Sequence, residues 1–199
     1  MIQTLSLLGS TGSIGTQALD IIRRLGIQVK ALAAYRNIER LEQQIREFQP
    51  EFAAVYDVAL AKELKLRVAE CYTRIGAGMD GLLEAAVLPG SEMMFNSVVG
   101  MVGLLPTLEA IQAKKKIALA NKETLVAGGA LVMEAAKKQG VPVYPVDSEH
   151  SAVFQCIQGC PERKALKKLI LTASGGPFFG KSMKELEQVS PEQALKHPN

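Results

Sequence analysis

Three glycines, spaced three residues apart, lie within the first fifteen residues of the chain. Residues 5–15 read LSLLGSTGSIG, an apolar run followed by Gly9, Gly12 and Gly15. The apolar run predicts a strand, and the residues after the glycines predict a helix. Such a turn lets the backbone approach a pyrophosphate, which the first amides of the helix and its dipole then bind. The spacing differs from the usual G-x-G-x-x-G, so it favours a dinucleotide site but leaves an ordinary strand-to-helix turn open.

A basic residue lies where a dinucleotide-binding fold meets the adenosine ribose. The second apolar run, residues 29–34, is followed by Tyr35, Arg36 and Asn37. An acidic residue near this point favours NAD, whereas a basic one accommodates the 2′-phosphate of NADP. After this run no carboxylate appears before Glu39, and the planar guanidinium of Arg36 is suited to phosphate. We therefore predict NADPH rather than NADH as the cofactor; the alternative is an exposed loop arginine.

A polar segment, Asn121-Lys122-Glu123, follows another apolar run at residues 117–120. The carboxyl ends of strands line the ligand crevice of open α/β sheets, so these side chains are predicted to face the nicotinamide end of the cofactor. Lys122 could neutralise an oxygen charge during a reaction. Equally, Asn121 could cap the next helix, with Lys122 and Glu123 as solvated residues of its first turn. Spacing alone leaves both interpretations open.

Two carboxylates, Asp147 and Glu149, lie two residues apart after the apolar run 143–146. In an extended chain they project to the same side, where they repel unless a cation or proton lies between them. Hard oxygen ligands suit Mg²⁺ or Mn²⁺. The alternative is a helix start, with Asp147 or Ser148 as the cap and Glu149 next to the helix dipole. Spacing alone favours this alternative.

Short apolar runs alternate with longer helical segments along residues 4–146. This alternation is typical of β-α-β units and of a parallel sheet covered on both faces. We predict an α/β fold, with a Rossmann-like doubly wound parallel sheet over residues 1–146. The predicted strands are residues 4–8, 29–34, 53–55, 93–98, 117–120 and 143–146. The predicted helices are residues 13–25, 38–48, 58–68, 81–88, 104–113, 122–139 and 151–158.

The pattern changes after Val146. Residues 147–199 hold a short helix, a basic turn, one more predicted strand at 169–172, and a glycine turn. Ser174, beside Gly175 and Gly176, could bind a substrate oxyanion or phosphate, although a plain turn explains it nearly as well. About fifty residues form a poor independent core. We expect residues 147–199 to be the beginning of an α+β catalytic domain that is truncated here.

Composition excludes several classes of function. The 199 residues are 48% hydrophobic and 22% charged, with a net charge of +3 and no tryptophan, which argues against nucleic-acid binding. No run approaches the roughly 18 apolar residues that cross a bilayer, and the start lacks the basic leader of a signal peptide. We expect no membrane association and a cytoplasmic location. Three cysteines fit reduced thiols, and His150, Cys156 and Cys160 match no standard zinc spacing.

Taken together, these segments resemble the 1-deoxy-D-xylulose 5-phosphate reductoisomerases. The matching stretches, in order, are GSTGSIG (9–15), NSVVGMVGLLPTLEAIQAKKKIALANKE (96–123), PVDSEH (145–150), LTASGGPF (171–178) and HPN (197–199). The resemblance implies an enzyme that uses NADPH and a divalent metal, Mn²⁺ or Mg²⁺ with Co²⁺ also possible. Such an enzyme rearranges 1-deoxy-D-xylulose 5-phosphate and reduces the product to 2-C-methyl-D-erythritol 4-phosphate in the non-mevalonate isoprenoid pathway. It also implies a homodimer.

The resemblance further implies roles for individual residues. NADPH would be bound by Thr11, Gly12, Ser13, Ile14, Arg36, Asn37, Asn121 and Glu123. Catalysis would involve Lys122, Asp147 and Glu149, with Asp147 and Glu149 as metal ligands and Lys122, Ser148 and Ser174 in contact with the substrate. A divalent ion chelating ketone and hydroxyl oxygens acts as a Lewis acid, and Lys122 can stabilise developing oxygen charge. The resemblance thus favours functional roles for Lys122 and the two carboxylates.

Two departures from the family matter. Tyr35 stands where the family commonly has glycine, which affects a backbone contact to the cofactor but not the charge of Arg36. Family members also continue well beyond residue 199, with a third acidic metal ligand, most of the substrate phosphate site, a lid and a helical domain. We therefore expect NADPH binding with little or no turnover; the alternative is a truncated, non-catalytic NADPH-binding module. Another dehydrogenase on this fold would need a catalytic Cys or His, and the predicted crevice segments contain neither.

Overall fold

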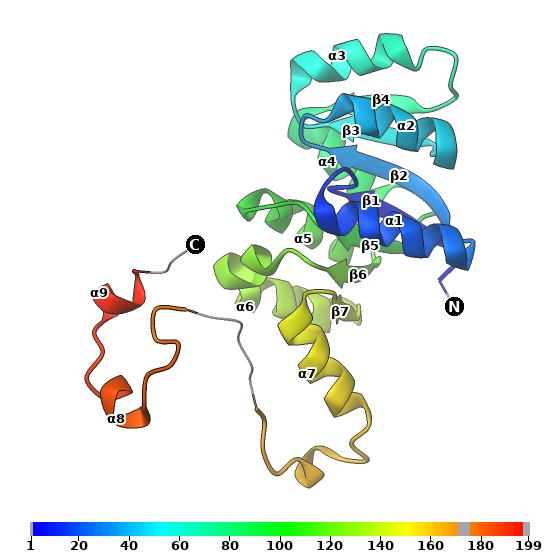
Figure 1. Cartoon of the computed structure of the whole chain (residues 1–199). Coiled ribbons are helices and arrows are strands. Elements are labelled where there is room, and N and C mark those ends of the chain that lie inside the picture. The colour runs from blue at the N-terminus through cyan, green and yellow to red at the C-terminus, as the bar shows by residue number, and fades with distance from the viewer. Residues whose placement is uncertain (1, 171–175, 197–199) are drawn as a thin grey trace. The chain divides into compact units, whose positions relative to one another are not determined.

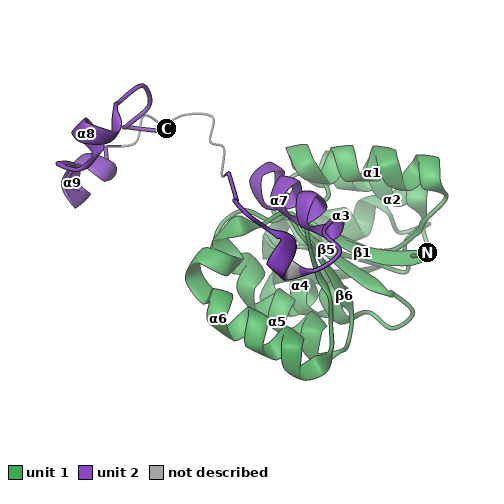
Figure 2. Ribbon diagram, turned by 90° about the horizontal axis from the view of Figure 1, so that it is seen from below, with its two compact units in different colours: residues 1–147 green, residues 148–199 purple. Residues whose placement is uncertain are grey.

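The computed structural model describes residues 2–170 and 176–196. The chain divides into two compact units, residues 1–147 and residues 148–199 (Figure 2). In the first unit the strands are β1 (Thr4–Leu8), β2 (Gln28–Ala34), β3 (Phe52–Val55), β4 (Arg74–Ala77), β5 (Met93–Asn96), β6 (Lys116–Leu119) and β7 (Val143–Pro145) (Figure 1). Its helices are α1 (Ser13–Leu25), α2 (Ile38–Phe48), α3 (Val58–Arg67), α4 (Gly78–Val87), the 3₁₀ turn η1 (Met101–Gly103), α5 (Leu104–Gln112) and α6 (Lys122–Gln139).

The strands form one parallel sheet of seven, in the order β4-β3-β2-β1-β5-β6-β7. The chain builds outward from β1 to β4, then returns to place β5 on the other side of β1. The prediction of a Rossmann-like doubly wound α/β fold is therefore confirmed. The carboxyl ends of β1 and β5 flank the point where the strand order reverses, which is where open sheets bind ligands.

Helices cover both faces of this sheet, so its central strands are apolar on both sides. In β1, Leu5 and Leu7 belong to a hydrophobic cluster with α1, α2 and α3. The neighbouring Leu8 belongs to a second cluster, with α4, α5 and α6. Because side chains alternate between the faces of a strand, the leucines of residues 5–8 contribute to both layers.

The edge strand β4 was missed by the sequence-based prediction. Its four residues read RIGA, and a glycine inside a short strand removes the apolar pattern by which strands are recognised. Gly76 is needed for packing, because a Cβ there would lie 2.4 Å from the ring carbon Cζ of Phe52. Since β4 ends at Ala77, helix α4 begins at Gly78, earlier than the predicted start at Gly81.

The second unit contains α7 (Ser148–Gln158), the 3₁₀ turn η2 (Arg163–Ala165), α8 (Met183–Leu186) and α9 (Pro191–Ala194). Helix α7 begins at Ser148 rather than at the predicted Ser151, and it buries none of its residues. The strand predicted at residues 169–172 is wrong for Leu169 and Ile170, and its other two residues lie outside the described part of the chain. A strand needs a neighbour for its backbone groups, and the described residues of this unit contain no other strand. In the described ranges, no helix is both long and apolar enough to cross a membrane.

Candidate functional site

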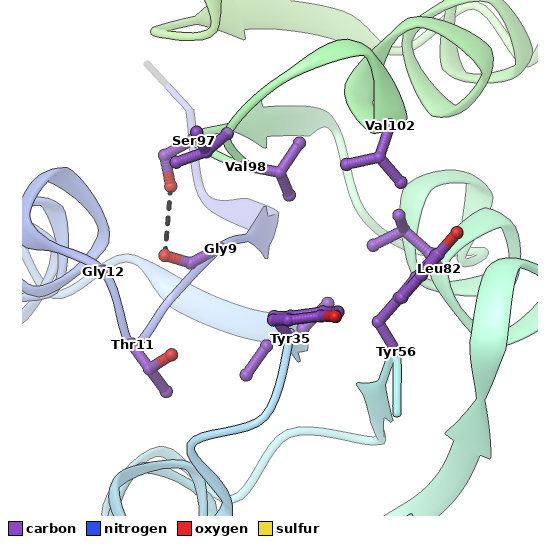
Figure 3. A pocket seen from close by; sticks show the side chains of 12 residues that line it. Gly9, Thr11, Gly12, Tyr35, Tyr56, Leu82, Ser97, Val98 and Val102 are labelled. Carbon is purple, nitrogen blue, oxygen red and sulfur yellow. Dashed lines mark hydrogen bonds between the residues drawn. The ribbon is translucent and has the colours of Figure 1, made fainter. Parts of the chain in front are cut away.

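A cavity of about 440 Å³ lies at the point where the strand order reverses (Figure 3). Its walls come from the glycine turn after β1, the end of β2, the residue after β3, helix α4, and the segment that follows β5. The lining residues are Gly9, Thr11, Gly12, Ala33, Ala34, Tyr35, Tyr56, Leu82, Ser97, Val98, Val99 and Val102. The predicted glycine turn therefore forms one wall of a real cavity.

Glycine is favoured at the three positions of the turn for different physical reasons. Gly9 has φ +84°, and a Cβ there would lie 2.5 Å from the carbonyl oxygen of Ser97. A Cβ on Gly15 would lie 2.1 Å from the Gly9 carbonyl oxygen, so both positions exclude a side chain by packing. At Gly12 the nearest atom to a Cβ would be 3.4 Å away, which an alanine tolerates. Since Gly12 lines the cavity, its missing side chain leaves room on the ligand side.

Neighbouring strands fix the position of the glycine turn. The backbone amides of Gly9 and Ser10 both donate to the Ala33 carbonyl at the end of β2, over 2.8 and 2.9 Å. On the other side, the Ser97 hydroxyl after β5 donates to the Leu8 carbonyl at 2.7 Å. It also donates to the Gly9 carbonyl at 3.3 Å (Figure 3). The turn is thus held between the two strand ends that flank the cavity.

The start of helix α1 is suited to an anion. Gly12 is the N-cap residue and provides no capping side chain, and the first turn holds no acidic residue. The first amides of a helix have no partner within it, and the macrodipole makes this end positive. Arg23 and Arg24 lie in the last turn, where cations are favourable. A phosphate group fits the N-terminal end of α1.

Arg36 lies beyond the end of β2, next to the cavity residue Tyr35. Its side chain is 64% exposed, and its Nε lies 3.3 Å from Oδ2 of Asp57. The other carboxylate oxygen of Asp57 accepts hydrogen bonds from the first-turn amides of α3, so this partner is fixed by a helix cap. The rings of Tyr35 and Tyr56 are 5.8 Å apart, and both line the cavity. An aromatic pair and a cation therefore lie side by side at the cavity rim.

Arg40 also reaches the glycine turn, a contact that the sequence analysis missed. Its Nη1 donates to the Thr11 carbonyl over 3.4 Å from the first turn of α2. The cap of that helix is Asn37, whose side chain accepts from the Arg40 amide at 3.1 Å. A cation in the first turn of a helix opposes the macrodipole, and that signal could have singled out Arg40.

Asn121 caps helix α6 and holds the cavity wall. Its Oδ1 accepts hydrogen bonds from the amide and hydroxyl of Thr124, both at 2.7 Å. Its Nδ2 donates to the carbonyls of Val98, at 2.6 Å, and Gly100, at 2.8 Å. These four bonds use the full capacity of the amide side chain. The cap alternative is therefore observed, whereas the cofactor contact of Asn121 stays a prediction.

Lys122 and Glu123 follow at the start of α6, at the same edge of the sheet as the glycine turn. Lys122 is exposed and Glu123 is half-buried, and neither lines the cavity. Helix α6 is interrupted at Gly128, whose φ of −134° and ψ of 23° are not helical. The structure thus places the two charged residues on a short helical segment near the crevice.

The extended-chain geometry predicted for Asp147 and Glu149 is wrong, because α7 already begins at Ser148. Asp147 follows β7 and ends the first unit, whereas Glu149 lies in the first turn of α7 in the second unit. Among the described residues, no three His, Cys, Asp or Glu side chains gather as a metal site would require. Ser174 lies outside the described residues. The roles of these residues stay predictions.

The parallel doubly wound sheet, with a cavity at a glycine turn, defines the first unit as a Rossmann-like α/β domain of the dinucleotide-binding type. Residues 5–129 match the family model described as 1-deoxy-D-xylulose 5-phosphate reductoisomerase. Residues 143–199 match the model for the C-terminal domain of that enzyme. The chain belongs to the 1-deoxy-D-xylulose 5-phosphate reductoisomerase family, and the resemblance found in the sequence is confirmed.

Relatives and solved structures agree with this assignment. A reductoisomerase from Lachnoclostridium phytofermentans is 54% identical over 196 residues, covering 98% of this chain and 50% of the relative. A reductoisomerase from Agathobacter rectalis is 52% identical over 196 residues, which cover 98% of this chain and 51% of the relative. The Zymomonas mobilis enzyme in complex with NADPH superposes with a TM-score of 0.83 at 40% identity, covering 100% of this chain and 52% of that one. A DOX-P reductoisomerase with NADPH, fosmidomycin and magnesium gives 0.81 at 38% identity, with the same coverage. The chain thus spans about half the length of the relatives it matches.

Proposed function

We propose that this chain binds NADPH at the glycine turn and serves the NADPH- and metal-dependent conversion of 1-deoxy-D-xylulose 5-phosphate to 2-C-methyl-D-erythritol 4-phosphate. The observation that carries the proposal is the cavity at the strand-order reversal, bordered by an uncapped helix start. Two solved reductoisomerase structures contain NADPH, and each superposes on the full length of this chain. The alternative is a non-catalytic NADPH-binding module.

In this proposal, residues 1–146 hold the cofactor. The amides of Ser13 and Ile14, with Thr11 and Gly12 at the cavity, bind the pyrophosphate because they begin helix α1. Arg36 and Asn37 follow the end of β2, where the 2′-phosphate of NADP is recognised. Asn121 and Glu123 follow β6, on the nicotinamide side of the crevice.

The catalytic part of the proposal rests on residues 147–199 together with Lys122. Asp147 and Glu149 would hold Mg²⁺ or Mn²⁺, since carboxylate oxygens are the ligands that hard cations prefer. When bound, the ion supplies Lewis acidity, and NADPH supplies the hydride. Lys122 stabilises negative charge on a substrate oxygen, and its place at a helix start, unfavourable for a cation, fits a role outside helix stability. Ser148 and Ser174 would contact the substrate.

We also propose that the chain forms a homodimer and acts in the cytoplasm; the support for both is the resemblance to the family.

The test of function has two measurements on the whole chain. A fluorescence titration should show NADPH binding that is tighter than NADH binding. A turnover assay with 1-deoxy-D-xylulose 5-phosphate, NADPH and Mn²⁺ should then show whether NADPH is oxidised. Binding without oxidation selects the non-catalytic module, and the absence of NADPH binding contradicts the proposal.

A further inference from the structure

We propose that Gln44 is a positioning residue that holds the glycine turn in the shape required to bind the pyrophosphate of NADPH. Gln44 lies on α2 and lines no part of the cavity, so it would act only through the turn. This inference rests on the proposed function, because it concerns how that cofactor site is built.

Gln44 and Ser10 form a reciprocal pair beneath the turn. The Ser10 hydroxyl donates to Oε1 of Gln44 at 2.7 Å, and Nε2 of Gln44 donates to the Ser10 carbonyl at 2.9 Å. Ser10 is 0% exposed and Gln44 is 6% exposed. Buried hydrogen bonds of this kind are costly to break, because the groups left behind cannot turn to water.

The pair fixes the direction of the backbone amide of Thr11. The Ser10 carbonyl and the Thr11 amide belong to one peptide unit, which is planar and trans, so the C=O and the N–H point in opposite directions. Because Gln44 holds the carbonyl toward α2, the Thr11 amide is directed away from α2. Thr11 itself lines the cavity. Without Gln44 this peptide is free to rotate, and the amide loses its fixed direction.

Helix α2 begins at Ile38, two residues after Arg36, with Asn37 between them as its cap. One rigid helix therefore connects the segment assigned to the 2′-phosphate with the turn assigned to the pyrophosphate. The 2′-phosphate and the pyrophosphate of NADPH are attached to the same adenosine ribose, so a fixed distance between their two sites preorganises the binding surface.

The test compares Gln44→Met with Gln43→Met in the whole chain. Gln43 is the exposed neighbour on the same helix, so it controls for the loss of a glutamine. Gln44→Met should raise the Kd for NADPH by about tenfold, because hydrogen bonds to a charged group contribute about 1.5–3 kcal/mol and depend on being held in place. Gln43→Met should leave the Kd unchanged. Titrations are made at a temperature where circular dichroism shows each variant folded.

Adenosine 2′-monophosphate separates positioning from general damage, because it carries the 2′-phosphate but no pyrophosphate. Its Kd should be the same in Gln44→Met and in the wild-type chain. An unchanged NADPH Kd, or an equal loss for both ligands, overturns the inference. Should Gln44→Met fail to fold, Ser10→Ala serves instead, since it removes the hydroxyl bond that holds the Gln44 side chain and adds no charge, and it too should raise the Kd for NADPH. If the wild-type chain itself does not bind NADPH, the proposed function fails first and the inference fails with it.

Discussion

Arg36 is the residue on which the preference for NADPH over NADH should depend. Its side chain is exposed at the cavity rim. Its Nε forms an ion pair with the Asp57 carboxylate, which is itself held in place as the cap of α3. We predict that Arg36→Asp raises the Kd for NADPH by about tenfold or more, because a charge-assisted hydrogen bond contributes about 1.5–3 kcal/mol. The new carboxylate can accept the ribose 2′-hydroxyl of NADH, so the gap between the two cofactors narrows. Parallel fluorescence titrations of the wild-type chain and the variant with NADPH and NADH measure the four dissociation constants.

Arg24→Asp is the matched control for that change of charge. Arg24 is exposed in the last turn of α1, at the opposite end of the helix from the glycine turn. It should leave both dissociation constants unchanged. Equal affinity of the wild-type chain for NADPH and NADH would show that Arg36 does not read the 2′-phosphate.

The buried hydroxyls of Ser6 and Thr107 should affect stability in opposite directions. In the part of the chain that the structure describes, the buried Ser6 hydroxyl has no hydrogen-bond partner. Thr107 is equally buried, but its hydroxyl donates to the Gly103 carbonyl at 2.7 Å and accepts from Asn96 at 2.8 Å. We expect Ser6→Ala to raise the free energy of unfolding by up to about 1 kcal/mol, and Thr107→Val to lower it by about 1–2 kcal/mol. Urea denaturation measures both; a loss in Ser6→Ala would contradict the first expectation.

Some residues of the site could be predicted from the sequence and others could not. The glycine turn was predictable because its spacing is a local sequence pattern that recurs in dinucleotide-binding folds, even though the atoms that Gly9 must avoid belong to the distant Ser97. Gln44 and Ser97 were not, because their partners are 34 and 89 residues away in the chain. No local pattern encodes such contacts, since they arise only when the strand order is known.

At the scale of elements, Lys115 ties the entry of β6 to the end of α4. Its ammonium donates to the carbonyls of Leu88 and Ser91, both at 2.6 Å, and the residue is 8% exposed. Lys115→Met should lower the free energy of unfolding by about 1–3 kcal/mol, because two buried carbonyls lose their donor. Lys114→Met, at the exposed neighbour, should change it by less than about 0.5 kcal/mol. An equal effect of the two substitutions would mean that these bonds do not join the elements.

The same lysine gives a dependence on pH. Burial lowers the pKa of the Lys115 ammonium below its ordinary value of 10.5. Between the folded and the unfolded pKa, the unfolded chain binds more protons, so stability rises with pH in that window. The free energy of unfolding of the wild-type chain, minus that of Lys115→Met, should therefore increase as the pH rises toward 10.5. Urea titrations of both proteins at several pH values measure it, and a decrease would contradict the prediction.

Elements were predicted where an apolar run or a periodic helix was long enough to be recognised. The ends of α1, α2 and α6 agree with the sequence pattern because an αL residue ends each helix, a glycine in α1 and α6. Strand β4 escaped because its glycine serves packing against a side chain on β3. Helix α7 begins at Ser148, three residues before the predicted start. The sequence did not decide this start, because Ser148 and Glu149 are compatible with the first turn of a helix as well as with an extended chain.

For the whole molecule, we predict that residues 1–147 fold and bind NADPH without the second unit. Both hydrophobic clusters consist of residues between Leu5 and Val143, so the core is complete within the first unit. The isolated unit should unfold cooperatively by circular dichroism, with a Kd for NADPH within about threefold of that of the whole chain. A non-cooperative transition would show that residues 148–199 complete the core.

The second unit was the harder part to predict. Its helix α7 buries no residue, and the predicted strand at 169–172 found no partner among the described residues. A pattern predicts structure through burial, so it has little force where few side chains are covered. The parallel sheet, whose strands are buried on both faces, was predictable for the opposite reason.

The two outer strands have a consequence for self-association. β4 has four residues, and β7 has three and ends in Pro145, which lacks an N–H. A second sheet could pair with either edge over only a few residues, which limits the backbone hydrogen bonds that such a joint ladder can form. When two copies of this chain meet edge to edge at this sheet, the shared backbone ladder can therefore extend over no more than four residues at β4 and three at β7.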